Sequence, residues 1–193
     1  HPSNCSLVVA GDCEPEALAQ LVESLVSRFF DGRKAEHVAR PKIAEPAKTT
    51  KPRVERAMHT TIARTLIGYK DPAAPHGTAL VKRESTVGIA LDMLYGRGTV
   101  FFDKLYQDGV VSGDFSAGYN ADSGFGYAVI GGETTNPAEL ERRLDARLKE
   151  VRESGFSPEE LARKKHKIYG RFLRNFETPE ATAFAHQSAW LSG

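Results

Sequence analysis

The sequence is poor in the features that mark several large classes of protein. It has two cysteines in 193 residues, too few for the disulfide framework of a small secreted domain. No apolar run approaches the roughly 18 residues that a membrane-spanning helix needs. Lysine and arginine number 26 against 25 aspartates and glutamates, a net charge of +1, whereas nucleic-acid-binding proteins carry a clear basic excess. We therefore expect neither a nucleic acid nor a membrane as a partner.

The composition that remains is typical of a folded globular chain. Hydrophobic residues make up 40% and charged residues 26% of the sequence, which argues against intrinsic disorder. At about 150 residues per domain, the length predicts that residues 1–193 form one domain. The two cysteines are expected to be reduced thiols of an intracellular protein. No signal segment is visible at the start of the chain, so we expect a cytoplasmic location.

Hydrophobic periodicity predicts five strands and six helices. The strands are expected at residues 7–10, 53–58, 61–69, 112–120 and 125–133. The helices are expected near residues 15–31, 77–95, 99–107, 136–155, 157–176 and 178–191. Pairs of strands separated by helices predict an α+β fold, a largely antiparallel sheet with helices packed on one face. Residues 33–52 are predicted to be a surface connection.

The histidines and cysteines do not form a zinc-binding pattern. The six histidines include neither H-E-x-x-H nor its inversion H-x-x-E-H. Cys5 and Cys13 lie at the two ends of a predicted strand, and at about 3.3 Å per residue they are too distant to share one ion. We therefore expect no metal site in this chain.

Three other motifs have ordinary structural interpretations. The glycine-rich residues 96–98 resemble the start of a dinucleotide-binding loop, but they follow a predicted helix instead of a strand and are interpreted as a helix breaker. No serine lies in a G-x-S-x-G elbow, which argues against a serine hydrolase. The basic residues 163–167 are interpreted as a solvated helix face, with contact to an acidic partner surface as the alternative. The residues themselves indicate no catalytic constellation.

The ends of the chain suggest a piece of something larger. The chain begins at His1 instead of methionine, and it ends just after Trp190, an aromatic side chain that should pack on something. We expect the sequence to be a fragment of a longer two-domain chain, with part of any site missing.

Four segments resemble, in their order and spacing, the pitrilysin/insulinase family of zinc peptidases, which includes mitochondrial processing peptidase. Residues 1–12 resemble the start of a second domain in that family. Residues 101–111 resemble its helix and turn after a glycine-rich segment. Residues 157–165 resemble the start of its penultimate helix, and residues 172–177 continue it. The resemblance covers essentially the whole chain.

In that family each half of the protein is a tandem of two similar α+β domains, and the resemblance makes this chain the second, non-catalytic one. It implies that zinc belongs to the missing catalytic domain and that this chain carries no catalytic residue and no cofactor. Second domains that support catalysis have an arginine before the glycine turn and a tyrosine after it, where this chain has Tyr106 and Ser112. The chain is therefore similar to the branch whose halves are separate chains. It would belong either to the zinc-bearing chain or to an inactive homologue, and the sequence leaves both open.

The function implied is that of a non-catalytic domain of a bacterial-type zinc metallopeptidase, which completes a peptide-binding chamber. The expected partners are the missing N-terminal domain of the same chain, a homologous second chain and a peptide substrate. Tyr106, Ser112 and Asp114 are the expected substrate-facing residues, on a wall formed by residues 101–115; the alternative for that segment is an ordinary helix–strand connection. The alternative function is a stand-alone module that holds a peptide or a partner along a sheet edge without hydrolysing it.

Overall fold

The computed structural model describes residues 5–30, 46, 48–122 and 124–192. The chain divides into two compact units: Glu45–Ile168, and His1–Ala44 together with Tyr169–Gly193. The expectation that residues 1–193 form one domain stays a prediction.

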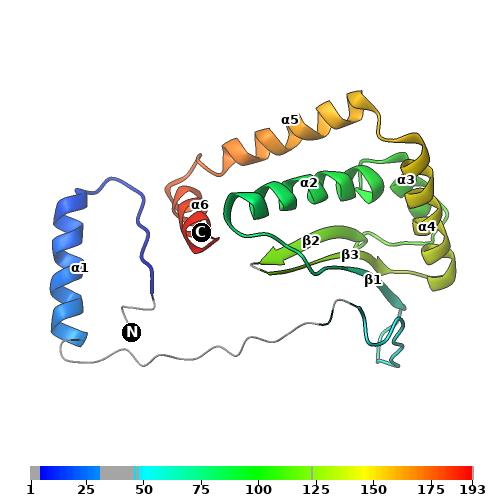
Figure 1. Cartoon of the computed structure of the whole chain (residues 1–193), viewed down its shortest axis with the longest axis horizontal. Coiled ribbons are helices and arrows are strands. Elements are labelled where there is room, and N and C mark those ends of the chain that lie inside the picture. Colours follow the sequence, from blue (N-terminus) through cyan, green and yellow to red (C-terminus); the bar gives the residue numbers. More distant parts are fainter. Residues whose placement is uncertain (1–4, 31–45, 47, 123, 193) are drawn as a thin grey trace. The chain divides into compact units, whose positions relative to one another are not determined.

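The larger unit contains an antiparallel sheet of three strands. These are β1 (Arg64–Asp71), β2 (Ser116–Asp122) and β3 (Phe125–Glu133), in the spatial order β1-β3-β2. The helices of this unit are α2 (Gly77–Tyr95), α3 (Val100–Gln107), α4 (Pro137–Ser154) and the first part of α5 (Pro158–Arg174). Helix α2 packs on β2 and α4 packs on β1, both on the same face of the sheet (Figure 1). The predicted α+β class, an antiparallel sheet with helices on one face, is confirmed.

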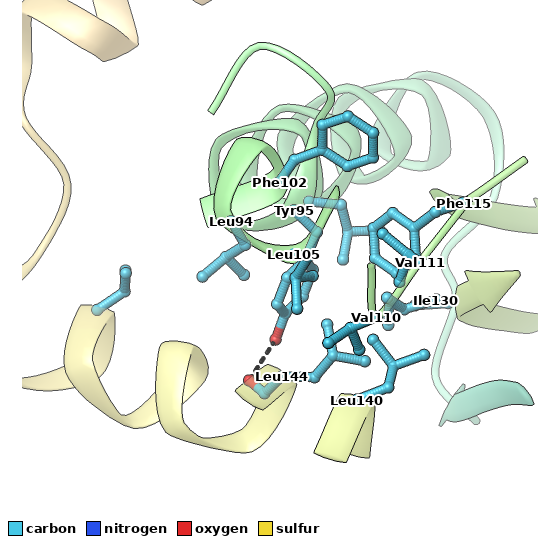
Figure 2. Packing of buried hydrophobic residues seen from close by; sticks show 13 residues of the cluster. Leu94, Tyr95, Phe102, Leu105, Val110, Val111, Phe115, Ile130, Leu140 and Leu144 are labelled. Atoms are coloured by element: carbon cyan, nitrogen blue, oxygen red, sulfur yellow. Dashed lines mark hydrogen bonds between the residues drawn. The ribbon is translucent and has the colours of Figure 1, made fainter. Parts of the chain in front are cut away.

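The core lies between that face of the sheet and the helices (Figure 2). Leu105 of α3, Phe115 before β2, Ile130 of β3 and Leu140 of α4 are almost fully buried. Burying each such side chain stabilises the fold by about 1.5–3 kcal/mol. The hydroxyl of Tyr95, at the end of α2, reaches α4 and donates a hydrogen bond of 3.2 Å to the carbonyl of Leu144. The core therefore joins the three helices to the sheet.

Helix α4 begins with an N-terminal cap. The side-chain oxygen of Asn136 accepts the backbone N–H of Glu139 at 3.1 Å, and Pro137 occupies the first turn. Helix α3 has a cap of the same kind, in which the hydroxyl oxygen of Thr99 accepts the N–H of Phe102 at 3.1 Å. These caps fix where the two helices start relative to the strands.

The smaller unit is helical where the structure describes it. It contains α1 (Pro15–Phe30), the end of α5 and α6 (Pro179–Ser192). No side chain of α1 is fully buried. Among the aromatic rings of this unit, Phe172 packs edge-on against Phe176, with ring centroids 5.2 Å apart. No helix among the described residues is both long and apolar enough to cross a membrane.

Two predicted strands are wrong. Residues 7–10 form no ladder, and Leu7 and Val9 instead line an open pocket together with residues of α1. Their apolar surface thus faces a neighbouring helix. A short apolar run in a sequence does not show whether the element that covers it is a helix or a sheet. Residues 53–58 also form no ladder, since Val54 and Met58 are 62% and 75% exposed and give a strand no face to bury. Most of the predicted connection 33–52 lies outside the described residues.

Two further strands exist but have shifted bounds. The strand expected at residues 61–69 runs over Arg64–Asp71, and the one expected at 112–120 begins only at Ser116. Residues 112–115 form a loop before β2, and this loop carries two of the predicted site residues.

Candidate functional site

Within the larger unit, the helices pack on one face of the sheet and leave the other face uncovered. Strand alternation directs Ile67, Ala117 and Ile130 toward the core. The same alternation directs Leu66 of β1 and Phe125 and Tyr127 of β3 to the opposite side, where they are 59%, 47% and 42% exposed. Together with the half-buried Val129 of β3, these side chains form an apolar strip that we call the open face.

Glycines lower the surface on both sides of the strip. Val129 pairs with Gly68 of β1 on one side and with Gly118 of β2 on the other. A Cβ atom placed on Gly118 would meet nothing within 4 Å, and one on Gly68 would meet only a carbonyl oxygen at 3.9 Å. The open face therefore has a shallow hollow on each side of Val129.

Four polar side chains gather where β3 ends, and we call them the polar cluster: Arg64, Ser112, Asp114 and Glu133. The hydroxyl of Ser112 lies 2.9 Å from Asp114 Oδ1 and 3.2 Å from Glu133 Oε2, so it donates to one of the two carboxylates at a time. The backbone N–H of Glu133 donates to Asp114 Oδ1 at 2.8 Å. The guanidinium of Arg64 lies 3.4 Å from Asp114 Oδ2. The cluster thus attaches the 112–115 loop to both β1 and β3.

Electrostatics favours a charged Asp114 in this arrangement. The N–H of Glu133 lowers the pKa of Asp114 most, and the Ser112 hydroxyl and Arg64 lower it further, against a smaller opposing effect of burial. At neutral pH Asp114 is therefore a carboxylate whose oxygens are used to hold the loop.

Gly132 of β3 and the buried ring of Phe115 allow the 112–115 loop to lie close to the sheet. A Cβ atom on Gly132 would lie 2.8 Å from Asp114 Oδ1 and 2.8 Å from the Cα of Phe115. Only a residue without a side chain fits there. Phe115, which is 0% exposed, anchors the end of the loop in the core. Gly109, with φ of +67°, makes the turn that leads from α3 into this segment.

A small pocket adjoins the polar cluster. Its volume is about 70 Å³, and it is lined by Ile62, Gly109, Val111, Ser112, Glu133, Thr134 and Thr135. At about 30 Å³ per water molecule, it has room for one or two waters and not for a peptide side chain. A peptide segment would therefore lie largely outside this pocket.

The structure brings two of the three predicted site residues together. Ser112 and Asp114 share a hydrogen bond, whereas Tyr106 belongs to neither the cluster nor the pocket lining. Tyr106 is 57% exposed on α3, where its ring stacks on that of Phe102 with centroids 6.1 Å apart. The rest of the predicted wall is mostly core, since its apolar members are buried: Phe102, Leu105, Val110, Val111 and Phe115.

Sequence reasoning missed Arg64 and Glu133. They stand 69 positions apart, and only the register of β1 against β3 makes them direct partners. A weak signal existed for Glu133 alone, the charged last residue of the strand predicted at 125–133, whereas Arg64 lies inside the strand predicted at 61–69.

The described residues offer no arrangement suited to zinc. No group of three or more histidine, cysteine, aspartate and glutamate side chains within the described part of the chain could hold a metal ion. In the polar cluster the Arg64 guanidinium occupies the position beside Asp114 that a cation would need. Cys5 and Cys13 are exposed free thiols. The site is therefore one of polar contacts and apolar surface.

Comparison with protein families identifies the chain. A family model described as the Peptidase M16 inactive domain matches residues 1–168. The chain belongs to the M16 peptidase family. This confirms the resemblance to the zinc peptidases that the segment order indicated.

Relatives and solved structures agree with this M16 assignment. The chain is 31% identical over 186 residues to a Bacillus subtilis protein named uncharacterized zinc protease YmfH, a match that covers 95% of this chain and 42% of that protein. The M16 domain described here therefore spans less than half the length of this curated relative.

Three solved structures share the fold. An M16-like peptidase from Alicyclobacillus acidocaldarius superposes with a TM-score of 0.66 at 30% identity, covering 69% of this chain and 32% of the other. A protease from Helicobacter pylori gives 0.68 at 16% identity, over 95% and 44% of the two chains. The inactive peptidase domain of a zinc protease from Bordetella parapertussis gives 0.54 at 20% identity, over 72% and 75%. The last two support the fold alone.

Proposed function

We propose that this chain is the non-catalytic domain of a zinc metallopeptidase and that it forms one wall of a peptide-binding chamber. The observation that carries the proposal is the match of residues 1–168 to an inactive M16 domain. The lack of a metal-binding group among the described residues is consistent with it. Hydrolysis of a peptide bond requires an activated water or a nucleophile with a base, and the polar cluster supplies neither.

The rest of the proposed enzyme would lie outside this chain. The curated relative is more than twice as long as the matched region, which leaves room for a catalytic domain in the same polypeptide. In the proposal, zinc is bound by that domain, and a homologous second chain is a further candidate partner. The two free thiols fit a reducing, cytoplasmic location, which is part of the same proposal.

In this proposal the segment 101–115 faces the substrate through few residues. Most of its apolar side chains are core, and Tyr106, Ser112 and Asp114 are among the members that are at least partly exposed. Ser112 and Asp114 hold the loop in place through Glu133. Tyr106, exposed on α3, would be the residue of the three that touches a peptide directly.

The experiment compares this chain with the full-length protein. Both are incubated with a mixed peptide library, and products are identified by mass spectrometry with and without a chelator. The full-length protein is expected to give cleavage that the chelator abolishes, and the chain alone none. Chelator-sensitive cuts by the chain alone would overturn the assignment of a non-catalytic domain.

The alternative is a stand-alone binding module. Strands β1 and β2 are the two edges of the described sheet, and an added peptide strand at either edge would be held by backbone hydrogen bonds. A full-length reading frame separates the two functions. An H-x-x-E-H motif upstream of this domain supports the peptidase, and an initiator methionine just before His1 supports the module.

A further inference from the structure

We infer that the open face binds an extended peptide segment with bulky apolar side chains at alternate positions. The inference rests on the proposed function, because it assigns a substrate class to the wall of the proposed chamber. Four observations carry it: the repeat of the apolar strip, its hollows, its polar border and its size.

The repeat of the strip matches that of an extended chain. Phe125, Tyr127 and Val129 alternate along β3 and therefore stand about 6.7 Å apart. Side chains on one side of an extended peptide have the same repeat. A peptide lying along β3 can thus place every second side chain against the strip, which a helical segment with its 3.6-residue period cannot do.

The hollows beside Val129 suit bulky side chains. Gly68 and Gly118 flank Val129 in register, and the space above Gly118 is empty to 4 Å. A leucine or phenylalanine of the peptide would fill such a hollow and contact Val129 and its neighbour Tyr127. The space beside Val129 therefore favours large apolar side chains over small ones.

Polar and charged side chains border the strip on both sides. Asp122 of β2 pairs with Phe125, and Lys70 of β1 pairs with Tyr127 and donates to the carbonyl of Pro46 at 3.0 Å. Ser116 and Asn120 are exposed on the same side of the sheet as the open face, next to Gly131 and Tyr127. Their hydroxyl and amide groups can pair with the backbone of a peptide. The border thus provides hydrogen bonds that do not depend on the peptide's sequence, while the strip selects its side chains.

The size of the strip favours a single chain over a folded partner. Its apolar part is four side chains on two adjacent strands, a width of about 5–10 Å at the usual spacing between strands. A stable interface between folded domains or two copies buries about 800 Å² on each side and involves some 20 residues. An extended segment of about eight residues needs far less surface.

The test uses the purified chain and a fluorescent nine-residue peptide with blocked ends, in which leucine and threonine alternate. A peptide of the same composition with all leucines at one end is the control. We expect saturable binding of the alternating peptide in fluorescence anisotropy, at least about tenfold tighter than that of the control. Equal binding of both peptides, or none, would overturn the inference.

Three variants locate the binding site. Leu66→Ser combined with Tyr127→Ser should weaken binding at least about tenfold. Val81→Ser, at a similarly exposed apolar residue of α2, should leave it unchanged. Gly118→Val fits the open space and makes the face more apolar, yet it should weaken binding because it fills the hollow. Tighter binding by Gly118→Val, or an equal loss in Val81→Ser, would show non-specific adhesion and contradict the inference.

Two measurements separate this inference from its rivals. If the open face instead binds a second copy of the chain, sedimentation would show a dimer, and the Leu66→Ser/Tyr127→Ser variant would abolish it. That result would contradict the inference. In the full-length protein the same variant should raise KM for the alternating peptide and leave kcat unchanged. If the full-length protein binds no zinc and cleaves nothing, the proposed function fails, while the binding assay on this chain still decides the inference.

Discussion

Neighbouring residues of α3 occupy opposite environments, and this decides which of them can serve a ligand. Leu105 is fully buried, whereas the next residue, Tyr106, is 57% exposed and touches the core only through the ring of Phe102. A helix turns by about 100° per residue, and here this turn directs the Leu105 side chain into the core and the Tyr106 side chain away from it. Whether a side chain of α3 packs in the core or is accessible to a ligand therefore depends on its position around the helix, and not on its residue type.

The first prediction contrasts these two residues. Tyr106→Ala should change the free energy of unfolding by about 0.5 kcal/mol or less, because little buried surface is lost. Leu105→Ala should cost about 2–5 kcal/mol, because it leaves a cavity in the core. Thermal unfolding of both variants measures the contrast. A large drop in melting temperature for Tyr106→Ala would make this residue part of the core and remove the argument for a substrate-facing role.

The second prediction concerns a polar contact at the other end of the sheet. The Tyr119 hydroxyl donates to Asp71 Oδ2 at 2.7 Å, and Arg83 forms an ion pair with the same oxygen at 2.8 Å. The Tyr119 hydrogen bond lowers the pKa of Asp71 most, while burial, assisted by the Asp71 carboxylate, raises the pKa of Tyr119 to about 12. Since the folded-state pKa of Asp71 lies below the ordinary value of 3.8, its stabilising effect is complete above that pH and is lost as the pH falls through the folded-state value.

Tyr119→Phe should therefore destabilise the protein by about 1.5 kcal/mol at neutral pH, the usual contribution of a hydrogen bond to a charged group. The difference in the free energy of unfolding between the variant and the parent protein should shrink below about pH 3.8 as Asp71 becomes protonated. Urea unfolding at neutral and acidic pH measures both values. Tyr169→Phe, at an exposed tyrosine of α5, is the matched control. A difference that stays constant with pH would contradict the role given to Asp71.

At the scale of elements, a charged contact joins α5 to α2. The Lys164 side chain is 4% exposed, and its ammonium lies 2.9 Å from Asp92 Oδ2 and 3.0 Å from the Asp92 carbonyl. Lys167 approaches the same carboxylate at 3.2 Å. Burial raises the pKa of Asp92, but the two ammonium groups lower it more, and the net shift is downward. The contact joins the first part of α5 to the last turn of α2.

The third prediction tests this contact. Asp92→Ala should destabilise the protein by about 3 kcal/mol, because it leaves a buried ammonium with a carbonyl as its main partner. The double variant Asp92→Leu/Lys164→Met should recover most of that loss, since no buried charge remains. Lys167→Ala, at a half-exposed side chain, should cost less than about 1 kcal/mol. Chemical denaturation gives all three values, and an equal cost for Asp92→Ala and Lys167→Ala would mean that the buried pair contributes nothing.

At the scale of the whole molecule, the described residues combine a complete core with a site that lacks ionisable catalysts. The hydrophobic core of the larger unit is continuous from α2 through α4 to the sheet. The polar groups near the open face are occupied in holding the 112–115 loop. Such a division agrees with the inactive M16 domain that the family model describes.

The fourth prediction follows from that division. The purified chain should contain no stoichiometric zinc, because no adequate set of ligands exists among its described residues. Elemental analysis after dialysis against a weak chelator provides the measurement. About one zinc per chain would contradict the prediction and would require ligands from the residues at 1–4 or 31–45.

The sequence by itself determined the local elements of this protein. The Asn136-Pro137 start of α4, the β2–β3 hairpin around residues 123–124 and the antiparallel α+β class follow from caps, turns and periodicity, which act between residues close in the chain. The family resemblance also rested on short sequence segments that occur in a fixed order and spacing. These features need no knowledge of distant contacts, and for that reason they were predictable.

Only the tertiary structure decided which residues meet. A strand is stable through its ladder partner, so the apolar run at 7–10 and the segment at 53–58 were misread, because neither has a ladder partner in the described part of the chain. The pairing of Arg64 with Glu133 and of Val129 with its two glycines depends on register, which a shift of one residue would invert. The polar cluster and the open face are products of that register, because side chains far apart in sequence become neighbours only when the strands align.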